Sequence, residues 1–522
     1  MQENKSLKAI TEYFSLAPDN DAKIADSPVT GVTSDSRKVA DGYVFFAWRG
    51  GNFDSHQFIQ DAVERGAIAV VGTEYLAHPI PVPYFRVEDS RYWLAGFAAY
   101  LHDFPAGKLN VIGVTGTDGK TTTTNFIYNI LLAAGIHAGM VSTVNAVIGD
   151  RVIDTGFHVT TPEAPEVQQY LDEMVKAGVT HVVLEATSHG LAQQRVAFCE
   201  FDQAVVTNIT HEHLDYHGSY DGYLASKAKL FEYVAGRKDK PHAVKSFVVL
   251  NKEDRSYPVL ENISQDVNRI KYGLSATADL WASAITNTDD GIDFVIHYGE
   301  DTFPFHTHLK GDFNVLNCLA AIGITHFGLG IDYNTVQKGL DRVKSLIGRM
   351  EEIKMGQEFR AFVDFAHTPF GLEAALKSAR KMTKGRVIAV FGSAGLRDRL
   401  KRRMMAEMSA DLADVTVLTA EDPRTESLEG ILEKMAAAMQ AKGKIEGTDY
   451  YRVPDRGQAI RKAVALAQPG DLVIACGKGH EQSMCFGTTE YAWDEKTAMQ
   501  AALGELLNVA APKMPYLPTQ EN

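Results

Sequence analysis

The chain has 522 residues, which at about 150 residues per domain predicts roughly three domains and excludes one small module. Its 52 basic and 66 acidic residues give a net charge of −14, and 45% hydrophobic with 23% charged residues is ordinary for a globular protein, so disorder as the main state is excluded. An acidic chain repels polyphosphates at long range. We therefore expect no nucleic-acid partner, and any phosphate ligand must be held by a local site.

The number of cysteines and the length of the apolar runs indicate the cellular location of the protein. None of the four cysteines forms a C-x-x-C motif, and four are too few for disulfide bonds to stabilise a chain of this length. This favours a reducing compartment. Residues 1–15 have no apolar core of a signal peptide, and no run approaches the about 18–20 apolar residues of a membrane span. We expect a cytoplasmic monomer without membrane insertion.

Short apolar runs bounded by glycine or polar turns alternate with segments of helical period, for example at 111–115, 181–185 and 386–391. This alternation predicts an α/β fold with largely parallel sheets. A turn-rich stretch precedes the first strongly apolar run, and a new series of strands begins after the segment Ser345–Met350. The predicted domains are therefore 1–106, 107–345 and 346–522.

The strongest local motif is T-G-T-D-G-K-T at 115–121, between an apolar strand and a helical segment. Gly116 and Gly119 allow close backbone approach, and the amides at the helix start attract phosphate. Lys120 supplies a positive charge and Thr121 a hydroxyl for Mg²⁺. Val114 stands where the usual phosphate loop has its first glycine. The segment predicts a nucleotide site.

Carboxylates and histidines follow two further predicted strands. Glu185 ends one of them, and His211, His213, Asp215 and His217 follow the other. Ligands of open α/β sheets bind at the carboxyl ends of the strands. The H-x-H-x-D-x-H spacing is not that of structural zinc sites and has no nearby cysteine, so Mg²⁺ beside ATP is the favoured interpretation.

Lys227 and Lys229 lie on a predicted helix with the sequence Y-L-A-S-K-A-K-L-F-E-Y-V. Without further context, both lysine side chains would be predicted to lie in solvent. Together with further motifs, this helix makes the chain resemble the Mur ligase family of peptidoglycan assembly, most closely its tripeptide-synthetase branch. The ordered matches are S-D-S-R at 34–37, F-D-S-H-Q-F-I at 53–59, T-G-T-D-G-K-T at 115–121, T-T-P at 160–162, E-A-T-S-H-G at 185–190, H-L-D-Y-H at 213–217, F-N-V-L-N at 313–317, G-R-M-E at 348–351, D-F-A-H-T-P at 364–369, E-D-P-R at 421–424 and G-K-G-H-E at 477–481.

The resemblance implies three domains: an N-terminal UDP-sugar-binding domain, a central phosphate-loop ATPase on a mainly parallel sheet, and a Rossmann-like C-terminal domain that brings the amino acid. It implies that ATP phosphorylates the terminal carboxylate of a UDP-N-acetylmuramoyl dipeptide and that an amine then attacks the acyl phosphate. Physical reasoning agrees, because a free carboxylate is a poor acyl donor and cations must offset the charge of both anions. Alternatives are a folylpolyglutamate-synthetase-like ligase, a non-catalytic nucleotide-gated scaffold and a paralogue with another amino acid.

By the same resemblance, Lys227 is carbamylated and acts as a carboxylate-like ligand of Mg²⁺. Lys120, Lys227, His213 and Glu185 are the implied catalytic residues. The implied metal ligands are Thr121, Glu185, His213 and Lys227. His367 is a weaker candidate, and an interdomain salt bridge is the other interpretation of Arg349 and Asp364. The implied ATP contacts are Gly116, Thr117, Asp118, Gly119, Lys120, Thr121, Thr122, Asn317, Arg349 and Asp364.

The UDP-sugar peptide is assigned to two groups of residues. Arg195 also makes physical sense, since a peptide carboxylate suits a bidentate guanidinium. Val159 departs from the family, where an asparagine can stand. The implied contacts are Ser34, Ser36, Gly51, Asn52 and Phe53 to the uridine diphosphate, and Thr160, Thr161, Thr187, Gln193 and Arg195 to the muramoyl dipeptide.

The incoming amino acid is assigned to the third domain. Arg424 suits the distal carboxylate of meso-diaminopimelate, which is therefore favoured. Asp422 replaces a neutral amide of the family motif and Glu421 stays acidic, which favours a distal ammonium, so L-lysine and L-ornithine remain open. The implied pocket is Arg402, Glu421, Asp422, Pro423, Arg424, Gly477 and Glu481.

Overall fold

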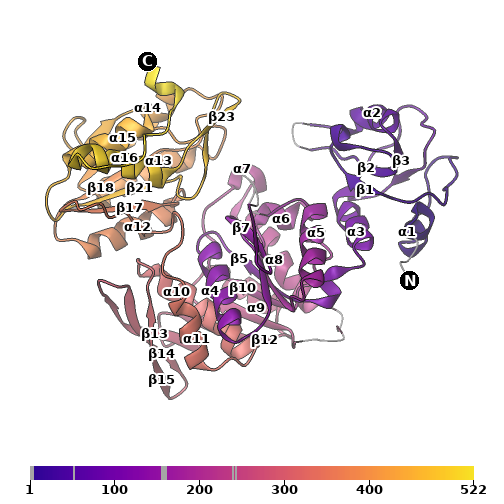
Figure 1. Cartoon of the computed structure of the whole chain (residues 1–522), viewed down its shortest axis with the longest axis horizontal. Coiled ribbons are helices and arrows are strands. Elements are labelled where there is room, and N and C mark those ends of the chain that lie inside the picture. The colour runs from indigo at the N-terminus through magenta and orange to yellow at the C-terminus, as the bar shows by residue number, and fades with distance from the viewer. Residues whose placement is uncertain (1–4, 51–52, 155–160, 238–239, 241–243, 522) are drawn as a thin grey trace.

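The computed structural model describes residues 5–50, 53–154, 161–237, 240 and 244–521. Three sheets follow one another along the chain, and each is covered by helices (Figure 1). The predicted α/β class with largely parallel sheets is confirmed.

The first sheet is parallel throughout, in the order β1 (Gly31–Thr33), β2 (Tyr43–Phe46), β3 (Ala67–Gly72) and β4 (Tyr84–Arg86). Its helices are α1 (Leu7–Tyr13), α2 (Ile59–Glu64) and α3 (Ser90–Leu101). The last of these joins the first sheet to the central part of the chain by packing against α5 (Ala164–Lys176). Across this junction Gln194 donates to Asp89, and His102 pairs with Asp172.

The central sheet has eleven strands in the order β15-β14-β13-β12-β11-β10-β5-β9-β6-β7-β8. A parallel middle is flanked by antiparallel hairpins at both edges. The strands are β5 (Asn110–Thr115), β6 (Ala138–Val141), β7 (Asn145–Ile148), β8 (Arg151–Asp154), β9 (His181–Glu185), β10 (Gln203–Val206), β11 (Phe247–Asn251), β12 (Asn268–Gly273), β13 (Leu280–Asn287), β14 (Ile292–Tyr298) and β15 (Asp301–Thr307).

Helices cover both faces of the central sheet, because alternate residues of its strands are apolar on both sides. Along β5, Val111 packs into one core, whereas Ile112 and Val114 pack into the other. The first core is closed by α5, α8 (Tyr220–Ala235) and α9 (Tyr257–Ile263). The second is closed by α4 (Lys120–Ala133), α10 (Phe313–Ile322) and α11 (Tyr333–Asp341). Two short helices, α6 (Ser188–Ala192) and α7 (Leu214–His217), follow strand ends.

The third sheet has the order β16-β17-β21-β18-β19-β20 and is parallel except for its first pair. One face packs against α12 (Pro369–Met382), α13 (Leu400–Leu412) and α14 (Leu428–Ala441), and the other against α15 (Arg456–Leu466) and α16 (Glu495–Leu507). The strands are β16 (Glu351–Glu352), β17 (Arg360–Asp364), β18 (Val387–Phe391), β19 (Val415–Leu418), β20 (Tyr450–Arg452), β21 (Leu472–Cys476) and the separate hairpin β22 (Ser483–Phe486) and β23 (Thr489–Ala492).

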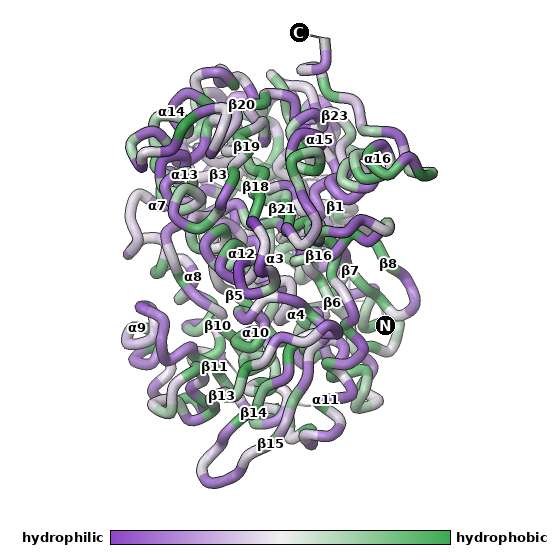
Figure 2. Tube along the Cα trace, turned by 90° about the vertical axis from the view of Figure 1, so that its left-hand side faces the viewer, coloured by the Kyte–Doolittle hydropathy of each residue, from purple (hydrophilic) through white to green (hydrophobic). Residues whose placement is uncertain are grey.

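The strands of the three sheets occupy 31–86, 110–307 and 351–476, so none crosses residue 107 or 346. We retain these two positions as proposed domain boundaries. Hydrophobic segments gather in the interior and hydrophilic ones along outer loops (Figure 2). In the part of the chain that the structure describes, every helix is too short or too polar to cross a membrane.

Candidate active site

The phosphate loop joins β5 to α4, and two glycines set its shape. Gly116 and Gly119 have φ of +152° and +83°, in the left-handed region that favours glycine. A Cβ at Gly116 would lie 1.8 Å from the hydroxyl oxygen of Thr207, and one at Gly119 would lie 2.3 Å from Oδ1 of Asn317. The loop therefore packs tightly, while the amino end of α4, which has no side-chain cap among the described residues, faces a cavity.

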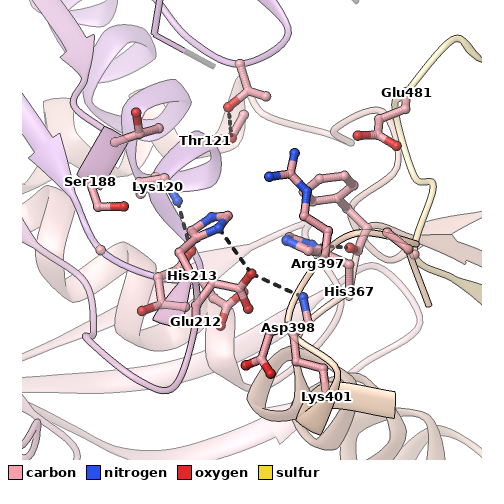
Figure 3. Close-up of a pocket in the computed structure, with 18 of the residues that line it drawn as sticks. Lys120, Thr121, Ser188, Glu212, His213, His367, Arg397, Asp398, Lys401 and Glu481 are labelled. Atoms are coloured by element: carbon pink, nitrogen blue, oxygen red, sulfur yellow. Dashed lines mark hydrogen bonds and ion pairs between the residues drawn. The ribbon is translucent and has the colours of Figure 1, made fainter. Parts of the chain in front are cut away.

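We call this cavity the polar cavity. It lies between the central and third domains, and Figure 3 shows Lys120 and Thr121 of the central domain facing Arg397, Lys401 and Glu481 of the third. Its lining is Gly116, Thr117, Asp118, Gly119, Lys120, Thr121, Thr143, Thr187, Ser188, Glu212, His213, Asp215, Tyr223, Lys227, Arg349, Phe365, His367, Ala394, Arg397, Asp398, Lys401, Glu421, Asp422, Arg424, Gly477 and Glu481.

A second cavity adjoins the first, with which it shares Asp118, Gly119 and Phe365. Thr122, Asn317, Arg349 and Asp364, all predicted to contact ATP, line it. Its remaining wall mixes apolar and polar side chains, as a nucleoside requires. Those wall residues include Asn251, Glu253, Tyr272, Phe313, Leu316, Phe370 and Ala374.

Asp364 and Arg349 connect the third domain to this region in different ways. The Asp364 carboxylate accepts backbone hydrogen bonds from Met350 and Ala366 at 2.6 and 2.8 Å. Arg349 stacks over the ring of Phe365 and donates to the Thr121 hydroxyl at 3.2 Å. Among the described residues neither side chain forms a salt bridge, so the interdomain salt bridge considered from the sequence is not found, and Arg349 instead reaches the phosphate loop.

Glu185 lies at the carboxyl end of β9 and is 1% exposed. Its Oε2 accepts a hydrogen bond from the Thr143 amide at 2.8 Å and another from the Thr143 hydroxyl. Its Oε1 is buried and has no hydrogen-bond partner among the described residues. A buried carboxylate oxygen without a donor is costly unless a cation satisfies it. The donor set around it therefore fits a metal ion.

Lys227, on α8, lies beneath the phosphate loop, and its buried Nζ donates to the Gly116 carbonyl at 2.5 Å. Burial lowers the pKa of Lys227 well below its usual value, and the charge of Lys120 lowers it further. Burial therefore favours the neutral form of the amine. A neutral amine is nucleophilic, as carbamylation by carbon dioxide requires.

His213 precedes α7 in a left-handed conformation, with φ of +52°. Burial, followed by the nearby His189, lowers its pKa far below the usual range, so a ring nitrogen keeps a lone pair for a cation. The other histidines of the cluster have separate partners. His211 pairs with Asp398 at 2.8 Å, and His217 contacts Ser226 at 3.1 Å.

Acidic residues at the amino-acid end of the polar cavity are partly neutralised. Asp422 Oδ1 accepts from Lys478 Nζ at 3.0 Å and from the Cys485 amide at 3.0 Å. Lys478 is fully buried and also pairs with Glu481 at 2.5 Å. Burial raises the pKa of Glu421 to about 7. The acid at position 422 therefore adds less negative charge to the cavity than the sequence suggested.

The structure does not bring Arg402 to the polar cavity. It lies on the inner side of α13, where both terminal nitrogens donate to Glu426 at 2.7 Å, and its side chain is 1% exposed. Arg397, in the loop before α13, lines the cavity instead, and sequence reasoning missed it. Its position after the carboxyl end of β18 was the available signal.

The guanidinium groups of Arg397 and Arg424 lie near one another. The charge of Arg424 lowers the pKa of Arg397 in addition to burial. Within the described ranges neither guanidinium has a hydrogen bond or ion pair. Two such groups in one cavity suit an anionic ligand.

The residues expected around the dipeptide form one hydrogen-bonded group beside Glu185. Thr161 bonds the Glu185 carbonyl and the Thr187 hydroxyl at 3.1 and 2.9 Å. Arg195 donates to Gln193 and the Thr161 carbonyl and pairs with Glu163 at 2.8 Å. Only Thr187 of this group lines the polar cavity.

Ser34, Ser36 and Phe53, the described residues expected around the uridine diphosphate, lie in the first domain and do not line the polar cavity. Ser36 begins a short 3₁₀ helix beside Ser34, and Phe53 is 58% exposed and stacked on Phe58. Gly51, Asn52 and Thr160 lie outside the described residues. Pro423 is not part of the described lining of the polar cavity.

Contacts that sequence reasoning missed link the two domains around the site. Lys401 of α13 pairs with the buried Glu212 at 3.1 Å, and the Thr368 hydroxyl contacts Asp118. Each contact joins residues more than 180 positions apart, so no local sequence pattern could predict it.

Comparison with known proteins identifies the family. Residues 28–100 match the family description "Mur ligase family, catalytic domain", residues 114–325 "Mur ligase middle domain" and residues 348–479 "Mur ligase, glutamate ligase domain". The chain belongs to the Mur ligase family. It is 40% identical, over 97% of its length and 99% of the relative's, to UDP-N-acetylmuramyl-tripeptide synthetase of Roseiflexus sp. strain RS-1.

Two further relatives carry a more specific name. The UDP-N-acetylmuramoyl-L-alanyl-D-glutamate–2,6-diaminopimelate ligase of Geobacillus thermodenitrificans is 39% identical over 91% of this chain and 95% of its own. A solved structure of a ligase with that name is 30% identical with a TM-score of 0.64 and covers 96% of this chain and 99% of its own. The three-domain Mur ligase architecture thus extends over nearly the whole chain.

Proposed function

We propose that this chain is an ATP-dependent ligase that adds a diamino acid, with meso-diaminopimelate favoured, to UDP-N-acetylmuramoyl-L-alanyl-D-glutamate in peptidoglycan synthesis. One observation carries the proposal: the polar cavity is lined both by the phosphate loop and by Arg397 and Arg424, whose guanidinium groups have no ion-pair partner among the described residues. Such a cavity can join a phosphate donor to an amino acid. The names of the relatives at 39–40% identity support the same reaction.

In the proposed reaction a carboxylate oxygen of the dipeptide attacks the γ-phosphorus of ATP and ADP leaves. The amine of the diamino acid then attacks the acyl carbon, and phosphate and a proton are released. The amides of the phosphate loop and Lys120 hold the phosphates, and Arg349, which reaches Thr121, adds a second positive charge from the third domain. Closing the cavity between domains excludes water from the acyl phosphate.

Mg²⁺ would be held by Thr121, Glu185, His213 and a carbamylated Lys227, and when bound it would offset charge on the phosphates. Three observations support this set. Glu185 Oε1 is buried without a hydrogen-bond partner among the described residues, and burial lowers the pKa of both His213 and Lys227, which favours their neutral, metal-binding or nucleophilic forms.

Charge balance at the amino-acid end favours diaminopimelate over L-lysine or L-ornithine. Lys478 neutralises much of the charge of Asp422 and Glu481, whereas Arg397 and Arg424 keep theirs. A distal carboxylate would satisfy both guanidinium groups. A distal ammonium alone would leave two like charges facing it.

The first domain would hold the uridine diphosphate, where the exposed ring of Phe53 offers a face on which uracil can stack. Arg195 would exchange Glu163 for a carboxylate of the dipeptide. The presence of this domain argues against a folylpolyglutamate-synthetase-like ligase. All four cysteines are free, which supports a cytoplasmic location, and the working form is proposed to be a monomer.

The test is ATP-dependent phosphate release with the UDP-dipeptide and, separately, meso-diaminopimelate, L-lysine and L-ornithine. The expected result is release with diaminopimelate. Phosphate release only with lysine or ornithine would overturn the charge argument for diaminopimelate but would leave the proposed ligase activity in place. ATP binding without release for any of the three would favour the nucleotide-gated scaffold or a paralogue with another amino acid.

A further inference from the structure

A cluster of imidazole and carboxylate groups lies at the edge of the central sheet, apart from the polar cavity. His306 is in β15, His308 follows that strand, and Asp290 is in the loop between β13 and β14. The strands β13 to β15 form the outer corner of the molecule at the bottom of Figure 1. No step of the proposed reaction uses these residues.

Local sequence explains why both imidazoles point the same way. In a strand, alternate residues face the same side, and the residue between the histidines, Thr307, is fully buried. His306 and His308 therefore lie together on the face opposite to Thr307, where both are partly buried. The loop at Gly291 then brings Asp290 beside them, since a Cβ at that glycine would lie 1.9 Å from the Thr307 carbonyl.

Three ligand atoms meet in this cluster. His306 Nε2 lies 3.4 Å from His308 Nδ1. Asp290 Oδ2 lies 3.0 Å from His308 Nδ1 and 3.9 Å from His306 Nε2. A tetrahedral zinc ion with bonds of about 2.0–2.1 Å needs its ligand atoms about 3.3–3.4 Å apart. The three distances bracket that edge length.

One outer atom of the cluster, Nδ1 of His306, has the carboxylate partner that a metal-binding histidine requires. His306 Nδ1 lies 2.7 Å from Asp293 Oδ1, so a carboxylate can hold the ring with Nε2 facing inward. Asp293 and His306 are direct partners across the β14–β15 pair. His308 Nε2 lies 3.8 Å from Asp341 at the end of α11.

Lys344 is the one cation in direct contact with the cluster among the described residues. Its Nζ lies 2.6 Å from His308 Nε2, on the side of that ring away from Asp290. An ammonium can only donate, so in this arrangement His308 Nε2 accepts and Nδ1 carries the ring hydrogen. Metal binding at Nδ1 therefore requires loss of that proton and movement of Lys344 away from Nε2. The charge of Lys344 opposes a divalent cation, and its removal should strengthen binding.

We propose that Asp290, His306 and His308 form a binding site for a borderline divalent cation of the zinc class, with the fourth position open to water. Nitrogen and carboxylate ligands in this number suit Zn²⁺ rather than Mg²⁺, which prefers six oxygens. Bound metal would tie the β13–β14 loop to the end of β15. Because binding favours the folded state, it would also raise the thermal stability of the chain.

The experiment uses the full chain without an affinity tag, stripped with a chelator and dialysed against Zn²⁺ in excess Mg²⁺. Bound zinc is counted by elemental analysis, and Co²⁺ is substituted to record the absorption of a tetrahedral site. The variants are His306→Asn, His308→Asn and Asp290→Asn. The last is safe for folding because its side chain is 79% exposed. His297→Asn is the matched control, since His297 is in β14 and stacks on Trp281 outside the cluster.

The expected result is one zinc per wild-type chain, kept by His297→Asn and by His213→Asn, and bound at least about tenfold more weakly by each cluster variant. Zn²⁺ should raise the melting temperature of the wild type and not that of Asp290→Asn. Lys344→Met should bind zinc more tightly. Zinc retained by all three cluster variants, lost only with His213→Asn, or absent from the wild type at micromolar concentration would overturn the proposal.

Discussion

Glu421 offers a quantitative test of how the amino-acid end of the cavity is built. Its side chain is buried, its Oε2 has no hydrogen-bond partner in the described part of the chain, and burial raises its pKa from 4.5 to about 7. The folded chain therefore keeps a proton on this group where the unfolded chain has lost it. The stabilisation is complete below pH 4.5 and is lost as the pH rises through 7.

The cost of burying this anion follows from the two pKa values. It is about 1 kcal/mol at pH 5 and about 3 kcal/mol at pH 8. Glutamine has nearly the same shape and cannot ionise. Glu421→Gln should therefore be more stable than the wild type, with a gap that grows by about 2 kcal/mol between these pH values. For a domain of this size that growth corresponds to about 4–8 °C in melting temperature.

The assay is thermal and urea unfolding of wild type and Glu421→Gln at pH 5 and pH 8. Glu433→Gln is the control, since Glu433 lies on the exposed side of α14. A gap of equal size at both pH values would refute the reasoning, as would the same pH trend in the control. The variant should also show a raised KM for the diamino acid, because the cavity loses a group that can pair with an ammonium.

Four further variants test the site. Lys120→Ala should abolish ATP-dependent phosphate release and leave the circular dichroism spectrum unchanged, because Nζ lies at the phosphate loop outside the apolar cores. Near-normal phosphate release would show that the mechanism does not depend on Lys120. Lys227→Ala should be inactive and partly rescued by acetate, and a rescue that never appears would argue against carbamylation. Arg424→Ala should raise KM for diaminopimelate by about 10–100-fold and leave lysine little changed, whereas equal losses would make the arginine structural. Arg402→Ala should destabilise the chain by about 2–3 kcal/mol, because its charge-assisted hydrogen bonds to Glu426 are lost, and should leave KM unchanged. A selective effect on KM would return Arg402 to the pocket.

The sequence by itself determined the fold class and the local parts of the site. The phosphate loop lies within a dozen consecutive residues, and its strand, glycines and helix start are set by short-range sterics at Gly116 and Gly119. The alternation of apolar residues in β5 likewise fixed a sheet covered on both faces. The order of the motifs along the chain was enough to indicate the family.

Only the tertiary structure decided which charged side chains pair with one another and which line the polar cavity. Arg402 and Arg397 are five positions apart, yet one packs inward against Glu426 and the other lines the cavity. The negative charge of Asp422 is balanced by Lys478, which lies 56 residues away in the loop after β21. Burial and pairing depend on which distant elements pack together, and these long-range contacts set the charge of a cavity. Residue type alone therefore could not choose among the diamino acids, whereas the packing around Asp422, Arg397 and Arg424 gives that choice a physical basis.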